Sequence, residues 1–288
     1  MVRLSRLSRY LLGGVAVMLC VPAGALAHEK EFAKFNACPS KTEGVAHCLY
    51  SVTSGGEILL GKKKTKIESP VTLQGGYSKE NSETHISTFT AASGAETLVK
   101  TKENVEGGLL GIVPPEESPA LVKLLSKYFF EHGLTQVFAT LELAKPASEI
   151  EVSNFNLLLG EGLALRLPVK VHLENAFLGS SCYVGSSGSP IIWNLTTGKT
   201  SPSAPNTSIE GKPGFPETKE EFRIAQVNEN TLVENNWSAP QASGCGGILS
   251  FLVDPVLDLM LGSTTAGHNT AILNNTIDTA TATAVNNH

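Results

Sequence analysis

Aspartate is the residue that this sequence most clearly lacks. Its three aspartates, Asp254, Asp258 and Asp278, all lie in the last 35 of its 288 residues. Glycosidases use two nearby carboxyl groups for their acid and base chemistry. The sequence contains no close aspartate pair placed for such work, so its residues do not point to glycoside hydrolysis.

Positive charge is also sparse. Three of the 22 basic residues, Arg3, Arg6 and Arg9, lie near the N-terminus, and the chain after residue 27 carries 19 basic and 27 acidic residues, a net charge of −8. A nucleic-acid-binding surface requires a basic patch. The one basic run, Lys62–Lys64 with Lys66, follows a glycine turn and is predicted to be a solvated hairpin end. We therefore predict no nucleic-acid partner.

Metal and cofactor motifs are missing as well. The seven histidines are scattered along the chain, and no pair has metal-ligand spacing on a recognisable helix. No glycine-rich motif suited to cradling a phosphate is present. We predict no metal site and no cofactor.

Long apolar runs are confined to the N-terminus. Arg3, Arg6 and Arg9 precede an apolar core at Leu11–Val21, and a small-x-small cleavage site follows at residues 25–27. This order predicts a signal peptide over residues 1–27, cut between Ala27 and His28. After its removal no apolar run is long enough to span a membrane. The remaining 261 residues are predicted to form a single secreted domain, with a possible sub-boundary near residues 112–118.

Four cysteines follow the predicted leader. An even number of cysteines in an exported chain indicates disulfides, and four cysteines allow three connectivities. We favour Cys38–Cys48 and Cys182–Cys245, because each pair brackets its own block of predicted strands and turns. The other two connectivities stay open at this point.

Alternation of apolar and polar residues is the strongest structural signal. Residues 162–174 read GLALRLPVKVHLE. From Leu163 onwards, an apolar side chain falls on every second position. Because a strand points successive side chains to opposite faces, this pattern predicts a long strand with one apolar face. Pro168 cannot donate to a ladder, which predicts an edge or a bend there. With the shorter strand patterns elsewhere, we predict a mainly β protein, as a two-sheet sandwich or an open barrel.

Two helices and one long loop interrupt the strands. A helix over residues 119–132 is predicted from the spacing of Leu121, Leu124, Leu125 and Tyr128, with Ser118 as its N-cap, and its aromatic residues are expected in the core. A short helix near residues 255–261 is predicted to start at Asp254-Pro255. We expect it to be buried under a sheet, because two acids and no basic face argue against a membrane-lying helix. Residues 197–219 are rich in proline and predict a mobile loop.

One motif points to catalysis. The segment Cys182–Pro190 resembles the nucleophile loop G-D-S-G-G-P of chymotrypsin-like serine proteases, and Ala46-His47-Cys48 resembles their base motif A-A-H-C. The resemblance implies Ser187 as nucleophile, His47 as base, and the backbone N–H groups of Gly185 and Ser187 as the oxyanion hole. No aspartate lies between the two motifs, and Ser186 replaces the acidic residue of the family pattern. A serine hydrolase is therefore the alternative hypothesis.

The chain as a whole is similar to a group of uncharacterised secreted proteins of actinobacteria. The resemblance rests on FNACP (35–39), GGEILLGKKK (55–64), CYVGSSGSPIIWNLTTG (182–198), GCGG (244–247) and AGHNTAILN (266–274). It implies a secreted protein and no particular activity. The leading hypothesis from the sequence is therefore an exported, non-catalytic protein that binds an apolar small molecule or associates with the cell envelope at the cell surface.

Overall fold

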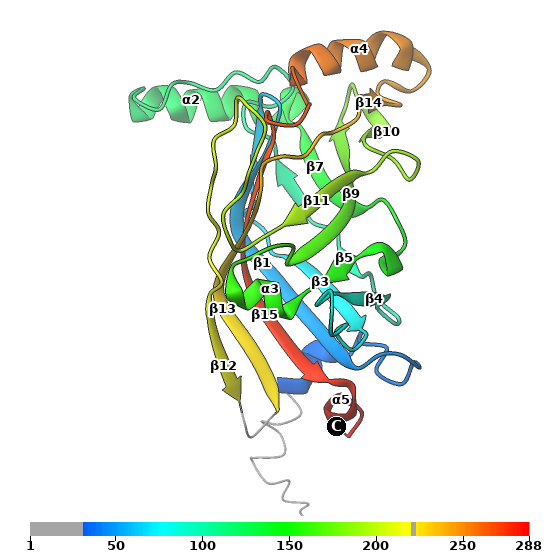
Figure 1. The fold of residues 1–288 in the computed structure, drawn as a ribbon. Helices are drawn as coiled ribbons and strands as arrows, with labels where there is room; N and C mark the ends of the chain where they lie inside the picture. The colour runs from blue at the N-terminus through cyan, green and yellow to red at the C-terminus, as the bar shows by residue number, and fades with distance from the viewer. Residues whose placement is uncertain (1–30, 220–222, 288) are drawn as a thin grey trace, which may run out of the picture.

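The structure, a computed structural model, describes residues 31–219 and 223–287 (Figure 1). The predicted signal peptide and its cleavage site lie outside these residues. The strands are β1 (His47–Leu60), β2 (Lys63–Lys66), β3 (Val71–Tyr77), β4 (Ser87–Ala91), β5 (Leu98–Val99), β6 (Lys102–Asn104), β7 (Phe138–Leu143), β8 (Glu151–Val152), β9 (Leu165–Asn175), β10 (Gly179–Val184), β11 (Ile191–Leu195), β12 (Phe215–Lys219), β13 (Ile224–Glu234), β14 (Ala242–Ser243) and β15 (Thr270–Thr281). The helices are α2 (Ala120–Phe130), α3 (Asn154–Leu159), α4 (Ser250–Leu261) and α5 (Ala282–Asn286), with 3-10 turns η1 (Ala33–Phe35), η2 (Gly133–Thr135), η3 (Ala147–Glu149) and η4 (Gly247–Leu249).

The prediction of a mainly β protein is confirmed. The 15 described strands form one antiparallel sheet that is not closed, with the order β12-β13-β15-β1-β3-β4-β8-β9-β10-β14 along its main path. The strands β2, β5, β6, β7 and β11 join this path at its sides. All strands are therefore linked through hydrogen-bonded neighbours, and one apolar core combines residues from before and after the segment 112–118.

The longest pairing joins two strands from opposite ends of the chain. β1 pairs with β15 from His47 opposite Thr281 to Leu59 opposite Thr270, with a shift of register between Thr53 and Gly55. Next to this bulge Gly56 has φ +113°, and a Cβ there would lie 2.0 Å from the carbonyl oxygen of Ile272. The close approach of the two strands therefore requires glycine at this position.

The long strand predicted at residues 163–174 is confirmed as β9, and of the edge or bend that Pro168 predicted, the edge is wrong. β9 pairs with β7 and β8 and also with β10 and β11, so it lies inside the sheet. Pro168 is tolerated because it lies between the end of the β7 pairing at Val169 and the start of the β8 pairing at Arg166. Its carbonyl still accepts a hydrogen bond from the Ala144 N–H, at 3.0 Å, just beyond β7.

The first predicted helix is present as α2, but its expected place in the core is wrong. The N-cap is Pro119 instead of Ser118, and no residue of α2 is buried. Leu121, Leu124 and Tyr128 each expose about two thirds of their surface (65%, 64% and 66%). The apolar face that the spacing predicts does exist, and it points away from the sheet.

The second predicted helix begins earlier than expected. α4 starts at Ser250 and places Pro255 inside the helix. The N-cap is Leu249, and the carboxylate of Asp254 instead accepts hydrogen bonds from the backbone N–H groups of Gly244 and Cys245, at 3.1 and 2.8 Å. The prediction of a helix buried under a sheet is also wrong, since only Leu257 and Leu261 of α4 are buried.

Both predicted disulfides are confirmed. Cys38 bonds to Cys48 at the start of β1, and Cys182 of β10 bonds to Cys245 just after β14. All four residues are buried. Two disulfides indicate folding in an oxidising, extracytoplasmic environment.

The proline-rich segment 197–219 is tied to the sheet at several points. Its last residues form β12, and an isolated bridge joins Lys212 to Thr231 of β13, while a second bridge, between Lys199 and Glu210, lies within the segment. The Asn206 side chain donates hydrogen bonds to the carbonyl groups of Asn235 and Asn269, at 2.8 and 2.9 Å. The segment is irregular for most of its length but is held by these contacts.

Candidate ligand cavity

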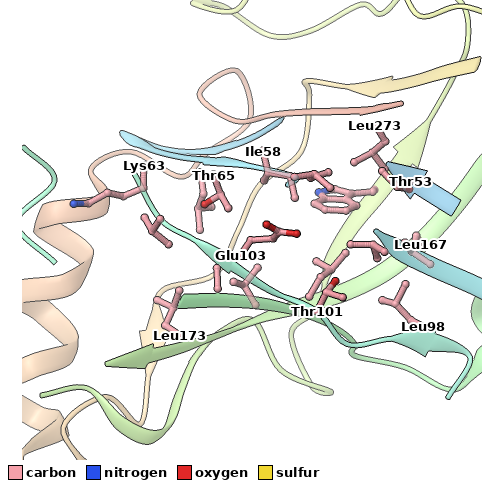
Figure 2. A pocket seen from close by; sticks show the side chains of 18 of the residues that line it. Thr53, Ile58, Lys63, Thr65, Leu98, Thr101, Glu103, Leu167, Leu173 and Leu273 are labelled. Atoms are coloured by element: carbon pink, nitrogen blue, oxygen red, sulfur yellow. The ribbon is translucent and has the colours of Figure 1, made fainter. Parts of the chain in front are cut away.

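An apolar cavity lies inside the curved sheet (Figure 2). Strands β1, β2, β3 and β15 supply wall residues from one half of the sheet, β7, β9 and β11 from the other, and α4 supplies Leu257 and Leu261. The cavity volume is about 110 Å³. One water molecule needs roughly 10–15 Å³ on this measure, so the space is large enough for several atoms of an apolar ligand.

Strand alternation explains why the walls are apolar. β9 lines the cavity with Leu165, Leu167, Val171 and Leu173. These residues alternate along one face of the strand. Val169 lies on the same face but is fully buried and does not line the cavity. β7 contributes Ala139 and Leu141 in the same way. The apolar face of β9 was predicted from the sequence, and the structure shows that much of it borders this cavity.

The opposite face of β9 carries a charged network. The Lys170 amine lies 3.1 Å from the Glu142 carboxylate and 4.3 Å from the centre of the Tyr183 ring. The His172 ring stacks on Tyr183 with centroids 4.5 Å apart. Hydrogen bonds and ion pairs with Lys170 and Lys100 overcome the opposing effect of burial and lower the pKa of Glu142. These charges therefore lie outside the cavity and stabilise the surface of the sheet.

A single carboxylate projects into the cavity. Glu103 of β6 exposes only 7% of its surface, and Figure 2 shows its carboxylate in the middle of the apolar side chains. It accepts hydrogen bonds from the backbone N–H groups of Glu68 and Ser69, at 3.1 and 2.9 Å. These bonds hold the carboxylate in place at one wall of the cavity.

Two polar groups on the cavity wall have no hydrogen-bond partner among the described residues. They are the indole Nε1 of Trp193 and the hydroxyl of Thr101. Trp193 is fully buried and packs edge-to-face against Trp237, with ring centroids 5.8 Å apart. Leaving a buried donor unpaired costs about 1–3 kcal/mol, and native proteins contain few such groups. Trp193 is therefore a buried donor beside the cavity, with no acceptor among the described residues.

Lys63 marks the end of the cavity near α4. Burial lowers the pKa of its amine, which donates a hydrogen bond to the carbonyl of Gly108 at 3.4 Å. In Figure 2 the amine points away from Glu103 and from the centre of the cavity. The next residue towards the hairpin tip, Lys62, donates its backbone N–H to the carbonyl of Leu261 in α4 at 2.7 Å.

The residues of the hydrolase hypothesis are not brought together. His47 lies at the start of β1, where its ring stacks on Tyr77 with centroids 5.2 Å apart. Ser187 is exposed in the turn between β10 and β11, and β3, β4, β8 and β9 separate β1 from β10 along the sheet. A glutamate such as Glu96, which precedes Ser187 in the chain, could replace the missing aspartate, but its carboxylate lies 3.7 Å from the amine of Lys100. No hydrogen bond or ion pair connects these three residues in the described part of the chain.

Metal-binding clusters and membrane-spanning helices are both absent from residues 31–219 and 223–287. No cluster of three or more histidine, cysteine, aspartate or glutamate residues there has the arrangement needed to hold a metal ion. None of the helices in these residues combines the length and the apolar character that crossing a bilayer demands.

Comparisons with protein-family models, with curated proteins and with solved structures found no match for this chain. The geometry of the cavity is therefore the basis of the functional argument.

Sequence reasoning missed the polar residues of the cavity, although a signal for them was present. Thr101, Glu103 and Val105 alternate with Lys102 and Asn104, as in a strand with one inward face. A glutamate between two inward residues would have indicated a carboxylate facing the interior. Trp193 follows the same rule between Ile191 and Leu195, both fully buried.

Proposed function

We propose that this protein is an exported, non-catalytic binding protein that holds an apolar ligand in the cavity. The observation that carries the proposal is the apolar cavity of about 110 Å³ with the unpaired Trp193 N–H on its wall. Ligand sites are typically concave and mostly apolar, with a few polar groups that fix the orientation of the ligand. In this proposal the two halves of the sheet act as two packed layers with the ligand between them.

The polar residues narrow the chemistry of the ligand. The Trp193 N–H is a donor only, so it calls for an acceptor such as a carbonyl or ether oxygen. An anionic ligand in the cavity would share the site with the Glu103 carboxylate, and two like charges in one buried site repel each other. The ligand is therefore a neutral lipophile with one hydrogen-bond acceptor, such as an ester, of which a segment of several atoms fills the cavity of about 110 Å³.

The compartment is part of the proposal. The two disulfides fit an oxidising environment outside the cytoplasm. The N-terminal sequence has the order of a signal peptide, and the resemblance to secreted actinobacterial proteins agrees with it. Together they support a secreted protein that works at the cell surface.

Organic extraction tests this function. The mature protein is secreted from its natural host or a related one, purified without detergent and extracted, and the extract is analysed by mass spectrometry. We expect one class of neutral lipophile in near-stoichiometric amount. The control is Ala139→Phe, which fills the cavity from β7 and should reduce the yield at least several-fold. An extract of the parent protein with no lipophile, or with the same amount as Ala139→Phe, would contradict the proposal.

A further inference from the structure

Exposed apolar side chains gather at one end of the molecule. Twenty-one large apolar side chains are exposed in the described part of the chain, and 17 of them lie in residues 110–134, at Phe177 and in residues 248–259. Figure 1 shows α2 and α4 together at this end, beyond the tips of the long strands. Apolar patches this rich are uncommon on proteins that stay free in water and mark surfaces of interaction.

α2 presents its apolar face to the outside. The helix is attached through its other face, where the Ser126 hydroxyl donates to the carbonyl of Ile112 at 3.3 Å and the Lys123 amine donates to the carbonyl of Glu116. Leu124 and Tyr128 lie on the outward face and are mostly exposed. An 11-residue helix gains little stability from its own hydrogen bonds and depends on burial of its apolar face. α2 therefore lacks the environment that its sequence requires.

α4 also turns an apolar face outward, and its two acids do not interfere. Asp254 accepts hydrogen bonds from Gly244 and Cys245, and Asp258 accepts one from the Ala242 N–H at 2.7 Å. Both carboxylates therefore point towards the β14 segment. The exposed positions of the helix are all apolar: Phe251, Leu252, Pro255, Val256 and Leu259. The objection that two acids exclude a membrane-lying helix is removed by this geometry.

The apolar end is continuous with the cavity. The inner face of α4 supplies Leu257 and Leu261 to the cavity wall, while its outer face is exposed. Lys127 lies at the border of the apolar face of α2, and the exposed Lys62 lies beside the C-terminus of α4 at Gly262. Lysines that border an apolar face in this way reach the headgroup region when a helix lies on a bilayer.

We propose that α2 and α4 dock this end of the molecule onto the surface of a lipid bilayer. Their outward apolar faces enter the boundary between headgroups and acyl chains, and the lysines contact the headgroups. Docking sets α4, and the cavity behind it, against a source of neutral lipophiles, so the purpose of the contact rests on the proposed function. At the opposite end of the molecule, near α5, Phe32 and Phe35 pack with Ala280 and Ala284.

Vesicle sedimentation tests the docking surface. The mature protein is mixed with vesicles of phosphatidylcholine that contain phosphatidylglycerol as the minor lipid. Two variants remove the outward faces: Phe251→Ser with Leu259→Ser in α4, and Leu124→Ser with Tyr128→Ser in α2. The control is Phe215→Ser, which removes a similarly exposed phenylalanine from β12 at the other end. We expect each double variant to lower vesicle partitioning at least tenfold and the control to leave it unchanged.

Other results would overturn the inference. They are a parent protein that does not sediment with vesicles, or double variants that sediment as the control does. Light scattering could also overturn the inference. If the parent protein is a dimer and the α4 variant is a monomer, this end of the molecule binds a second copy of the chain. Vesicle sedimentation tests only the docking surface. Ligand extraction from the same parent protein tests the cavity, so failure of the docking proposal can be distinguished from failure of the proposed function.

Discussion

The side chain of Trp193 both packs in the cavity wall and carries the N–H group that is proposed to bind the ligand. The indole fills the cavity wall against Trp237, and its N–H has no acceptor among the described residues. The Nε1 of Trp237 is equally buried and equally unpaired, but Trp237 does not line the cavity. The two tryptophans therefore form a natural matched pair for testing what the cavity binds.

Replacing Trp193 with phenylalanine should weaken ligand binding. The variant Trp193→Phe keeps most of the ring and removes the donor, so we expect a loss of about two- to tenfold in affinity, equivalent to one net hydrogen bond. Trp237→Phe should leave the affinity unchanged. Isothermal titration with a long-chain methyl ester measures both variants. Equal losses in the two variants would mean that the Trp193 N–H does not contact the ligand.

His47 should make folding sensitive to acid. Burial lowers the pKa of His47 below its ordinary value of 6.5, with a smaller opposing effect from Glu80. The folded protein therefore binds fewer protons at this site than the unfolded chain, so the contribution to stability is present above pH 6.5 and is lost as the pH falls below it. Urea unfolding from pH 7.5 to pH 5 should show a smaller loss of stability in His47→Gln than in the parent. A loss of the same size in both would rule out this role for His47.

At the scale of the single element, α4 shows which properties of a helix can be predicted from its own sequence. The sequence predicted a short helix near residues 255–261, and the helix that is present is longer, from Ser250 to Leu261. Its start was misplaced because Asp254-Pro255 has the sequence of an N-cap, whereas the carboxylate of Asp254 serves two N–H groups outside the helix. Its burial was misjudged because the two acids were taken as evidence against an exposed apolar face, whereas both carboxylates accept hydrogen bonds from backbone N–H groups at β14. Local sequence does not say which side of a helix a distant segment such as β14 will occupy.

The tether of α4 can be measured by substitution. Asp254→Ala leaves two backbone N–H groups without their charged acceptor, and we expect a loss of about 2 kcal/mol in the free energy of unfolding. Leu252→Ala changes the outward face of the same helix and should stay within about 0.5 kcal/mol of the parent. Denaturant titration of the two variants gives both values. A larger loss in Leu252→Ala would show that the outward face of α4 is packed against protein.

At the scale of the whole molecule, the sequence predicts those features that depend on short-range patterns of residues. The leucines of β9 predicted one apolar face, and the cysteines at 38, 48, 182 and 245 predicted both disulfides. The edge prediction at Pro168 failed because the strand changes partner there, from β7 to β8, and pairing partners are set by contacts across the chain. The cavity depends on the curvature of the whole sheet, and for that reason no single segment predicted it.

The measurement that tests the cavity most directly uses the fluorescence of Trp193. In Trp237→Phe the cavity tryptophan is the only indole of the mature chain, and bromine atoms quench an indole only at close range. Titration of this variant with a dibrominated long-chain methyl ester should give saturable quenching, and adding Ala139→Phe should abolish most of it. Quenching that does not saturate, or that is as strong with Ala139→Phe present, would contradict ligand binding in this cavity.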